Sequence, residues 1–509
     1  MDITQKIGQH FVCGFPGTTL DEPFRQAVRK YKIANCILFS RNIESKEQLK
    51  TLCEDIQTLV QAECGTSALI CIDQEGGMVT RLSEDCTNIP GAMALAATGD
   101  KTSVSSAGSI TGKELQALGV SCDFAPSLDV NSNKDNPVIG VRSYGDTADG
   151  VATYGLAMIE ALQGEGIMAV AKHFPGHGDT HVDSHLDLPL VTSKKEDLAE
   201  HLAPFRLAVL NGVQGIMSSH ILFPSLEKEK VPATMSRAIL TDLLKKEMGF
   251  KGLVFSDCME MQAIKDYYGT AAGSFAALKA GVDLVCISHH VDLAIQAIEL
   301  VVSALKGGDL DASEFESSTK KILKAKVMLA LEKKASFSEV GSKEHKALAQ
   351  KLCERSLTLV RGPLPDLGKT PFFIGPRCFQ ATKVSNGTES ALFPFEMAKF
   401  FTGDYYVCSE DPDGQEIEII KTSAKDASAL IVGTYNGHIH PKQIALVNIL
   451  AKEPIPVICI ALRNPYDLGL VDEKVVTVAA YEYTHRVFPA LAKLLKKEIK
   501  ATGKLPVAL

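Results

Sequence analysis

The densest group of side chains suited to catalysis lies between residues 172 and 185. The sequence there reads KHFPGHGDTHVDSH, which puts histidine at 173, 177, 181 and 185 and aspartate at 179 and 183. On a helix this four-residue spacing would place four imidazoles on one face, but Pro175, Gly176 and Gly178 disfavour a helix. The segment is therefore expected to be a loop rich in groups that transfer protons or bind metals.

Three interpretations of this loop remain open at this point. Neutral imidazole and carboxylate are common zinc ligands, so a metal-dependent hydrolase is one of them. A solvated, histidine-rich surface loop is the second. We favour the third, in which Asp183 and His185 form a carboxylate–imidazole dyad while Lys172 and His173 contact the substrate.

Other polar groups follow apolar runs elsewhere in the first 290 residues. They are the segment 73–77 (DQEGG), the segment 136–143 with Arg142, and Asp257. A single aspartate after a strand often caps the next helix, and that interpretation stays open for Asp129 and Asp283. Four such loops together favour one shared site over four separate caps.

The elements that carry these loops alternate regularly. Eight short apolar runs are expected to be strands, at 11–15, 36–40, 68–73, 122–129, 168–174, 215–221, 253–257 and 283–288. Amphipathic helical patterns separate them, for example at 155–164 and 239–248. Continuous apolar strands that alternate with helices indicate a parallel sheet buried on both faces. Eight units predict a (β/α)8 TIM barrel, whose active site lies at the carboxyl ends of the strands.

A second βα series follows the barrel. We expect a catalytic barrel domain over 1–336, a polar linker over 337–350 and a C-terminal three-layer α/β sandwich domain over 351–509. The strands of this C-terminal domain are expected at 371–374, 405–408, 429–433, 457–461 and 475–480. No glycine-rich phosphate-binding pattern follows its first strand. The loop 433–442 (GTYNGHIHPK) either reaches toward the barrel site or is plain surface.

Composition excludes several classes of protein. The 509 residues include 53 basic and 61 acidic ones, and the resulting net charge of −8 disfavours nucleic acid as a partner. Thirteen scattered cysteines indicate reduced thiols in a cytoplasmic protein rather than a disulfide framework. We see neither a secretory signal pattern nor an apolar run long enough for a membrane span, so no membrane partner is expected.

The motifs together resemble glycoside hydrolase family 3, in its β-N-acetylglucosaminidase branch with two domains. The resemblance rests on KHFPGHGDT followed by DSH, on DQEGGMVTRL, FAPSLDVN, NPVIGVRSYG and FSD in the same order, and more weakly on ALRNPYDL. It implies a retaining exo-β-N-acetylglucosaminidase that needs neither a metal nor another cofactor. Cys258 stands where the β-glucosidases of the family typically have Trp, which favours the N-acetylglucosaminidase branch.

The resemblance also implies roles for individual residues. Asp257 matches the catalytic nucleophile, and His185 matches the general acid/base, with Asp183 as its partner. The residues that match those holding the sugar hydroxyls are Asp73, Arg81, Arg142, Lys172 and His173. Because an imidazole titrates near pH ~6.5, His185 is suited to give and take protons near neutrality.

Two questions about the reaction stay open. An imidazole base does not repel an anion, so phosphate in place of water would make the enzyme a phosphorylase. A non-catalytic sugar-binding barrel is the alternative of another class. The absence of Trp favours a pocket for one terminal sugar over a cleft for long glycans, and so favours small cell-wall or chitin-derived fragments as substrates. The sequence does not indicate an oligomeric state.

Overall fold

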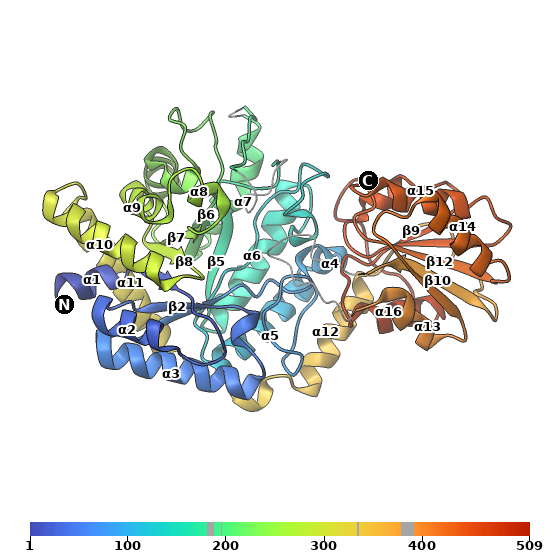
Figure 1. Cartoon of the computed structure of the whole chain (residues 1–509), viewed down its shortest axis with the longest axis horizontal. Helices are drawn as coiled ribbons and strands as arrows, with labels where there is room; N and C mark the ends of the chain where they lie inside the picture. Colours follow the sequence, from blue (N-terminus) through green and yellow to red (C-terminus); the bar gives the residue numbers. More distant parts are fainter. Residues whose placement is uncertain (181–187, 195, 333–334, 378–390) are drawn as a thin grey trace.

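A computed structural model describes residues 1–180, 188–194, 196–332, 335–377 and 391–509. It has two parts, a closed barrel of eight strands and a separate six-stranded sheet covered by helices (Figure 1). This arrangement confirms the predicted fold class, a TIM barrel followed by an α/β sandwich. We call the part built from the second sheet the C-terminal domain.

The barrel strands follow one another in sequence order and pair in parallel around the closed ring. Their bounds are β1 Phe11–Cys13, β2 Asn35–Leu38, β3 Leu69–Ile72, β4 Cys122–Asp123, β5 Met168–Phe174, β6 Gly215–Ser218, β7 Leu253–Cys258 and β8 Leu284–Ile287. Successive residues of a strand point to opposite faces. In β3, Ile70 packs outward against the helices and Cys71 packs in the barrel interior. Both faces are buried, which explains why the runs are mainly apolar and do not alternate between polar and apolar residues.

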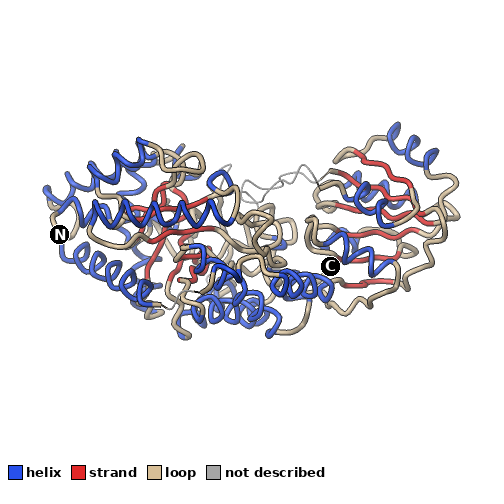
Figure 2. The backbone as a smooth tube through the Cα atoms, turned by 90° about the horizontal axis from the view of Figure 1, so that it is seen from below, coloured by secondary structure: helices blue, strands red, loops and turns tan. Residues whose placement is uncertain are grey.

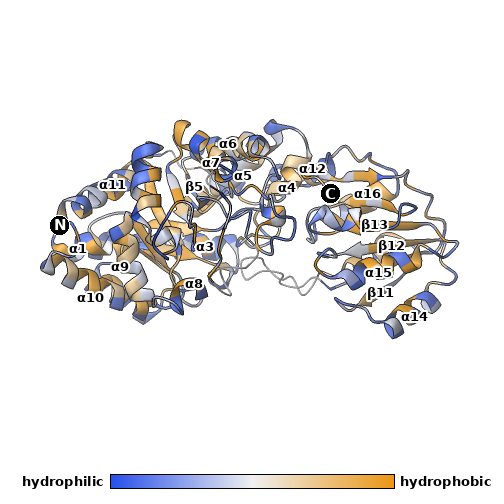
Figure 3. Ribbon diagram, turned by 90° about the horizontal axis from the view of Figure 1, so that it is seen from above, coloured by the Kyte–Doolittle hydropathy of each residue, from blue (hydrophilic) through white to orange (hydrophobic). Residues whose placement is uncertain are grey.

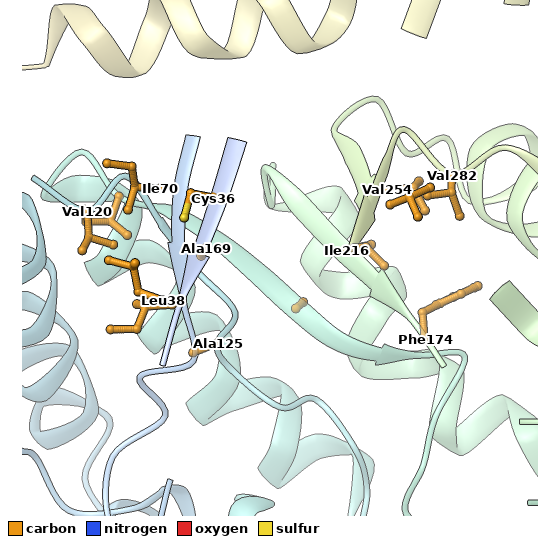
Figure 4. Close-up of a cluster of buried hydrophobic side chains, with 14 of the residues drawn as sticks. Cys36, Leu38, Ile70, Val120, Ala125, Ala169, Phe174, Ile216, Val254 and Val282 are labelled. Atoms are coloured by element: carbon orange, nitrogen blue, oxygen red, sulfur yellow. The ribbon is translucent and has the colours of Figure 1, made fainter. Parts of the chain in front are cut away.

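The outer layer of this core joins the strands to the surrounding helices. Figure 4 shows part of it, with Cys36, Ile70 and Phe174 among the labelled side chains. The helices of the barrel part are α1 Ile3–Gly8, α2 Glu22–Tyr31, α3 Lys46–Cys64, α4 Ala92–Ala97, α5 Lys101–Leu118, α6 Ala148–Gly164, α7 Leu198–Leu210, η4 Ala238–Glu247, α8 Gln262–Lys265, α9 Thr270–Ala280, α10 Val291–Gly307 and α11 Ala312–Leu331. Short 3-10 turns lie at η1 Ser40–Asn42, η2 Gly140–Arg142, η3 Ala233–Met235 and η5 Phe337–Glu339.

Helix α11 closes the amino end of the barrel. Ile322 packs in the interior cluster, and the buried Lys326 donates hydrogen bonds to Gln9 and Ala34, which precede β1 and β2. The amino ends of the strands are therefore covered. The carboxyl ends carry the long loops that contain the predicted site residues.

Two elements of the barrel differ most from expectation, although β1 and β6 also end earlier than expected. β4 is only two residues long rather than 122–129, because Pro126 has no N–H and cannot donate to a strand ladder. The helix expected at 239–248 is present as η4, but it is a π-helix. β5 has the expected bounds.

The C-terminal domain has strand order β11-β10-β12-β13-β14-β9. The bounds are β9 Thr358–Arg361, β10 Pro371–Pro376, β11 Asp404–Cys408, β12 Ala429–Thr434, β13 Val457–Ala461 and β14 Val476–Ala479. Five strands are parallel, and β9, which the sequence did not predict, pairs antiparallel with β14 at one edge. Figure 2 shows these strands side by side with helices on both faces.

The helices of this domain are α13 Phe393–Phe400, α14 Gly414–Ser423, α15 Pro441–Leu450, η6 Pro465–Gly469 and α16 Val487–Leu495. Helix α12, Lys343–Ser356, runs through the second half of the expected linker and leads into β9. Figure 3 shows apolar residues concentrated on the strands and polar residues toward the outer helices. Among the described residues, no helix has both the length and the apolar character needed to cross a bilayer.

Candidate active site

The predicted site residues that the structure describes lie at or beyond the carboxyl ends of the barrel strands. Asp73 directly follows β3, Lys172 and His173 lie near the end of β5, and Asp257 lies near the end of β7. Arg142 ends the short turn η2 in the loop between β4 and α6. In barrels of this kind the catalytic residues occupy this end.

Four charged groups form a compact buried cluster at this mouth. The ammonium of Lys172 lies 2.7 Å from Asp73 Oδ1 and 2.7 Å from Glu75 Oε1. Arg142 donates from Nε and Nη2 to the two oxygens of Glu75, at 2.9 and 2.7 Å. The side chains of Lys172, Arg142 and Glu75 are only 2%, 3% and 7% exposed. Two cations and two carboxylates thus neutralise one another away from water, as buried charges require.

The electrostatics hold Glu75, Arg142 and Lys172 in their charged forms. Burial alone would raise the pKa of the Glu75 carboxyl, but the charges of Arg142 and Lys172 lower it well below its usual range. Burial likewise opposes the charge on Lys172, yet Asp73 and Glu75 raise the pKa of its ammonium. Lys172 and Arg142 therefore keep the Glu75 carboxylate ionised.

A second carboxylate orients His173. Asp129 is fully buried, and its Oδ2 lies 2.7 Å from His173 Nδ1. Burial opposes ionisation of Asp129, but the neighbouring His173 lowers its carboxyl pKa below the usual range. An ionised carboxylate only accepts hydrogen bonds, so Nδ1 of His173 carries the proton and Nε2 faces Arg142, 3.5 Å away. Asp129 is therefore a positioning group in the site rather than a helix cap.

The start of the histidine-rich loop is anchored on the same aspartate. The N–H of His177 donates to Asp129 Oδ1 at 2.6 Å, and His177 Nδ1 lies 2.7 Å from the hydroxyl of Thr180. Burial, assisted by the neighbouring His173, lowers the pKa of the His177 imidazole to about 4. His177 is thus a neutral structural group at the base of the loop.

Asp257 occupies a half-exposed position on β7. Its Oδ1 accepts a hydrogen bond from the N–H of Cys258 at 2.7 Å. Asp257 and Asp73 both contribute, after burial, to the raised pKa of the Cys286 thiol in the barrel interior. A half-buried, correctly held carboxylate with access to the mouth has the chemistry of a nucleophile.

Arg81 is buried in the loop that carries Asp73. Its backbone N–H donates to Gln74 Oε1 at 2.8 Å, and its guanidinium lies 5.9 Å from the ring centroid of Phe39. Gln74 also accepts from the N–H of Leu82, so one amide side chain shapes this part of the loop.

Asp183 and His185 lie outside the described residues, so their predicted dyad is untested. Among the residues that the structure does describe, no group of three or more His, Cys, Asp or Glu side chains is arranged to hold a metal ion. Sequence reasoning missed Glu75 as a site residue. Its signal was available, because Glu75 stands two residues after Asp73 in the same strand-end loop.

Sequence analysis also missed a cluster near Asp257. The carboxylate of Glu260 accepts from the N–H of His289 at 2.6 Å and lies 2.5 Å from Nδ1 of His290. Arg41 in turn lies 3.0 Å from Nδ1 of His289 and is stacked on Phe39. These groups join the loops after β2, β7 and β8.

The chain is similar to known proteins in sequence and in fold. Residues 3–325 match the model of the glycosyl hydrolase family 3 N-terminal domain. Beta-hexosaminidase A of Pseudoalteromonas piscicida is 31% identical over 97% of this chain and 92% of its own length. A beta-hexosaminidase of Nitrosomonas eutropha is 35% identical over 55% of this chain and 80% of its own. A family 3 beta-N-acetylglucosaminidase from Paenibacillus sp. str. FPU-7 superposes with a TM-score of 0.93 at 35% identity, covering 100% of this chain and 99% of that one.

Proposed function

This chain belongs to glycosyl hydrolase family 3, and we propose that it is a retaining exo-β-N-acetylglucosaminidase. The observation that carries the proposal is the buried cluster of Asp73, Glu75, Arg142 and Lys172 at the mouth that also holds Asp257. The relatives named beta-hexosaminidase and the similar beta-N-acetylglucosaminidase structure support the identity of the sugar.

The reaction is a double displacement. In the first step Asp257 attacks the anomeric carbon, while His185 protonates the leaving oxygen and the aglycone departs. In the second step His185 removes a proton from water, which attacks the same carbon and releases Asp257 with net retention. Asp183 holds the imidazole of His185 and supports its charged form.

The pocket for the terminal sugar is formed by Asp73, Arg81, Arg142, Lys172 and His173. Asp73 and Lys172 present charged acceptors and donors, which make stronger hydrogen bonds to hydroxyls than neutral groups do. Such a pocket recognises one sugar with high specificity and suits small cell-wall or chitin-derived fragments. We place the enzyme in the cytoplasm, because the twelve cysteines among the described residues are all free thiols.

The proposal is tested by turnover of 4-nitrophenyl β-N-acetylglucosaminide and of the matching β-glucoside by the wild type and by Asp257→Ala. We expect turnover of the first substrate only, and its loss in the variant, because no other group replaces the nucleophile. EDTA should leave the activity unchanged, and product analysis with and without phosphate separates hydrolysis from phosphorolysis. Equal turnover of both sugars would refute the proposed specificity, and full activity of Asp257→Ala would refute the mechanism.

A further inference from the structure

The C-terminal domain meets the barrel through the carboxyl ends of its own parallel strands. Contacts come from the segments after β13 and β14, where Tyr466 and Tyr483 lie, and also from the last residues of the chain, where the N–H of Lys504 donates to the carbonyl of Ala97. In open α/β sheets this edge is where ligands usually bind. Here loops of the barrel occupy it, and Figure 1 shows the two parts meeting there near α4.

The first of these loops carries Asp73 and Glu75. Met78, three residues after Glu75, is buried in the hydrophobic cluster on one face of the second sheet, together with Ile431 and Ile460. The backbone N–H of Tyr483 donates to the sulfur of Met78 at 3.3 Å. The loop that supplies two carboxylates to the site is thus fastened to the C-terminal domain.

The second loop carries Arg142. Val141, the preceding residue, is buried in the cluster on the opposite face of the same sheet, together with Val432 and Tyr466. Asn131 in this loop donates from its side-chain amide to the hydroxyl of Tyr466 at 2.7 Å. Its carbonyl oxygen accepts from the N–H of Gly140 at 3.0 Å, so one asparagine links Tyr466 to the turn that ends in Arg142.

The backbone approaches closely at this junction. Gly140 has φ +46°, and a Cβ on it would lie 2.4 Å from Oδ1 of Asn464 in the C-terminal domain. Only glycine fits there, because the backbone is in the left-handed region and because a Cβ would collide with Asn464. The turn before Arg142 is therefore shaped against the C-terminal domain.

Tyr466 is itself held by the loop 433–442, for which sequence analysis left two interpretations. The ring of His438 lies edge-on to Tyr466, with centroids 5.4 Å apart. His438 Nδ1 lies 2.8 Å from the buried carboxylate of Asp467. In the described structure this loop contributes a buried support for Tyr466, which is neither of the two roles as first expected.

We propose that the C-terminal domain is a brace that sets the positions of Glu75 and Arg142, with Met78 and Tyr466 as positioning residues. The two loops insert on opposite faces of one sheet. Glu75 of the first loop and Arg142 of the second form one two-point ion pair. The sheet thereby fixes the distance between the halves of the sugar pocket. Displacing such groups by about 1 Å can cost on the order of 100-fold in rate.

The test compares two substitutions that each remove one buried hydroxyl. Tyr466→Phe removes the acceptor for Asn131, whereas Tyr481→Phe removes a 2.7 Å hydrogen bond to Thr358 inside the C-terminal domain. We expect kcat/KM on 4-nitrophenyl β-N-acetylglucosaminide to fall about tenfold in Tyr466→Phe, mainly through KM, and to change less than about twofold in Tyr481→Phe. Met78→Ala and Met397→Ala form a second pair for the same kinetic comparison. Met397→Ala is the control, because Met397 is buried in the same cluster but lies on α13.

Hydrogen–deuterium exchange supplies a readout that does not depend on activity. Amides of 131–142 should exchange faster in Tyr466→Phe than in the wild type, and should be unchanged in Tyr481→Phe. The kinetic part rests on the proposed function, whereas the exchange part does not. A wild type without glycosidase activity would therefore refute the function and leave the exchange test standing. Equal kinetics and equal exchange in Tyr466→Phe and Tyr481→Phe would overturn the proposal that the C-terminal domain positions Glu75 and Arg142.

Discussion

The carboxylate of Glu75 and the guanidinium of Arg142 form a two-point ion pair that joins two loops of the barrel mouth. Both oxygens of Glu75 are used, at 2.7 and 2.9 Å, and one of them also accepts from Lys172. The cations are almost fully buried; Arg142 pairs with this carboxylate, and Lys172 pairs with it and with Asp73. The pair is therefore a determinant of stability as well as of the shape of the sugar pocket.

Replacing Glu75 by Gln should destabilise the protein strongly. The variant leaves Arg142 buried without its carboxylate and Lys172 with only Asp73, and an uncompensated buried charge typically costs about 3–5 kcal/mol. Urea unfolding followed by circular dichroism measures this loss. Asp242→Asn, which breaks an exposed pair with Lys246, is the control and should change little. If both variants unfolded at the same urea concentration as the wild type, the cluster would not have the importance given to it here.

Replacing Arg142 by Lys should reduce activity although the charge is kept. A lysine cannot make two parallel hydrogen bonds to Glu75, so both the pair and the side of the pocket it shapes would shift. We expect kcat/KM to fall at least about tenfold. Arg237→Lys is a matched control, because Arg237 also binds a carboxylate, that of Glu314, through two nitrogens but at an exposed surface site. Equal activity of the two variants would contradict the role of Arg142.

The sequence predicts the barrel well because its strands are buried on both faces. Runs such as 284–287 (LVCI) are apolar throughout, and their regular alternation with helices leaves little choice of architecture. Strand length is harder to predict where polar residues enter the core. At β4, which contains the buried Asp123, the strand ends before Pro126, which has no N–H to donate, although Phe124 and Leu128 continue the apolar pattern. β9 was missed because it is an edge strand with only one buried residue.

The site was predictable residue by residue but not as a network. Asp73, Arg142 and Lys172 were identified individually, whereas Glu75, the common partner of Arg142 and Lys172, was not. Its place in the strand-end loop was visible in the sequence, but its pairing with Arg142, 67 residues away, was not. Asp129 was left open as a helix cap, since its contact with His173 depends on how the loop after β4 folds back. The same holds for Met78 and Tyr466, whose contacts exist only once the two domains pack.

Stability should fall as the pH drops from about 6.5 toward about 4. The pKa of His177 is lowered to about 4 by burial, so between these values the unfolded chain binds a proton that the folded protein does not. Above pH 6.5 both states are neutral, and below pH 4 both are protonated. The free energy of unfolding lost through His177 is about 3 kcal/mol once the folded protein is fully protonated. The buried His10, whose imidazole pKa is also lowered to about 4 by burial, adds to it in the same range.

Urea unfolding at several pH values measures this dependence. Circular dichroism is the suitable signal, because the chain has no Trp. His177→Gln keeps a neutral side chain that can hydrogen bond to Thr180 but cannot titrate, so its stability should vary less steeply with pH than that of the wild type. Identical slopes for the two proteins would mean that His177 does not titrate as the structure predicts.

The role assigned to His185 predicts a dependence on the leaving group. A 4-nitrophenolate departs without much protonation, whereas the alkoxide of a sugar must be protonated as the bond breaks. His185→Ala should therefore keep more of its activity on the 4-nitrophenyl glycoside than on N,N′-diacetylchitobiose. Asp257→Ala is the comparison, because loss of the nucleophile should abolish turnover of both substrates. If His185→Ala lost the same factor on both substrates, proton donation to the leaving group would have to come from another residue.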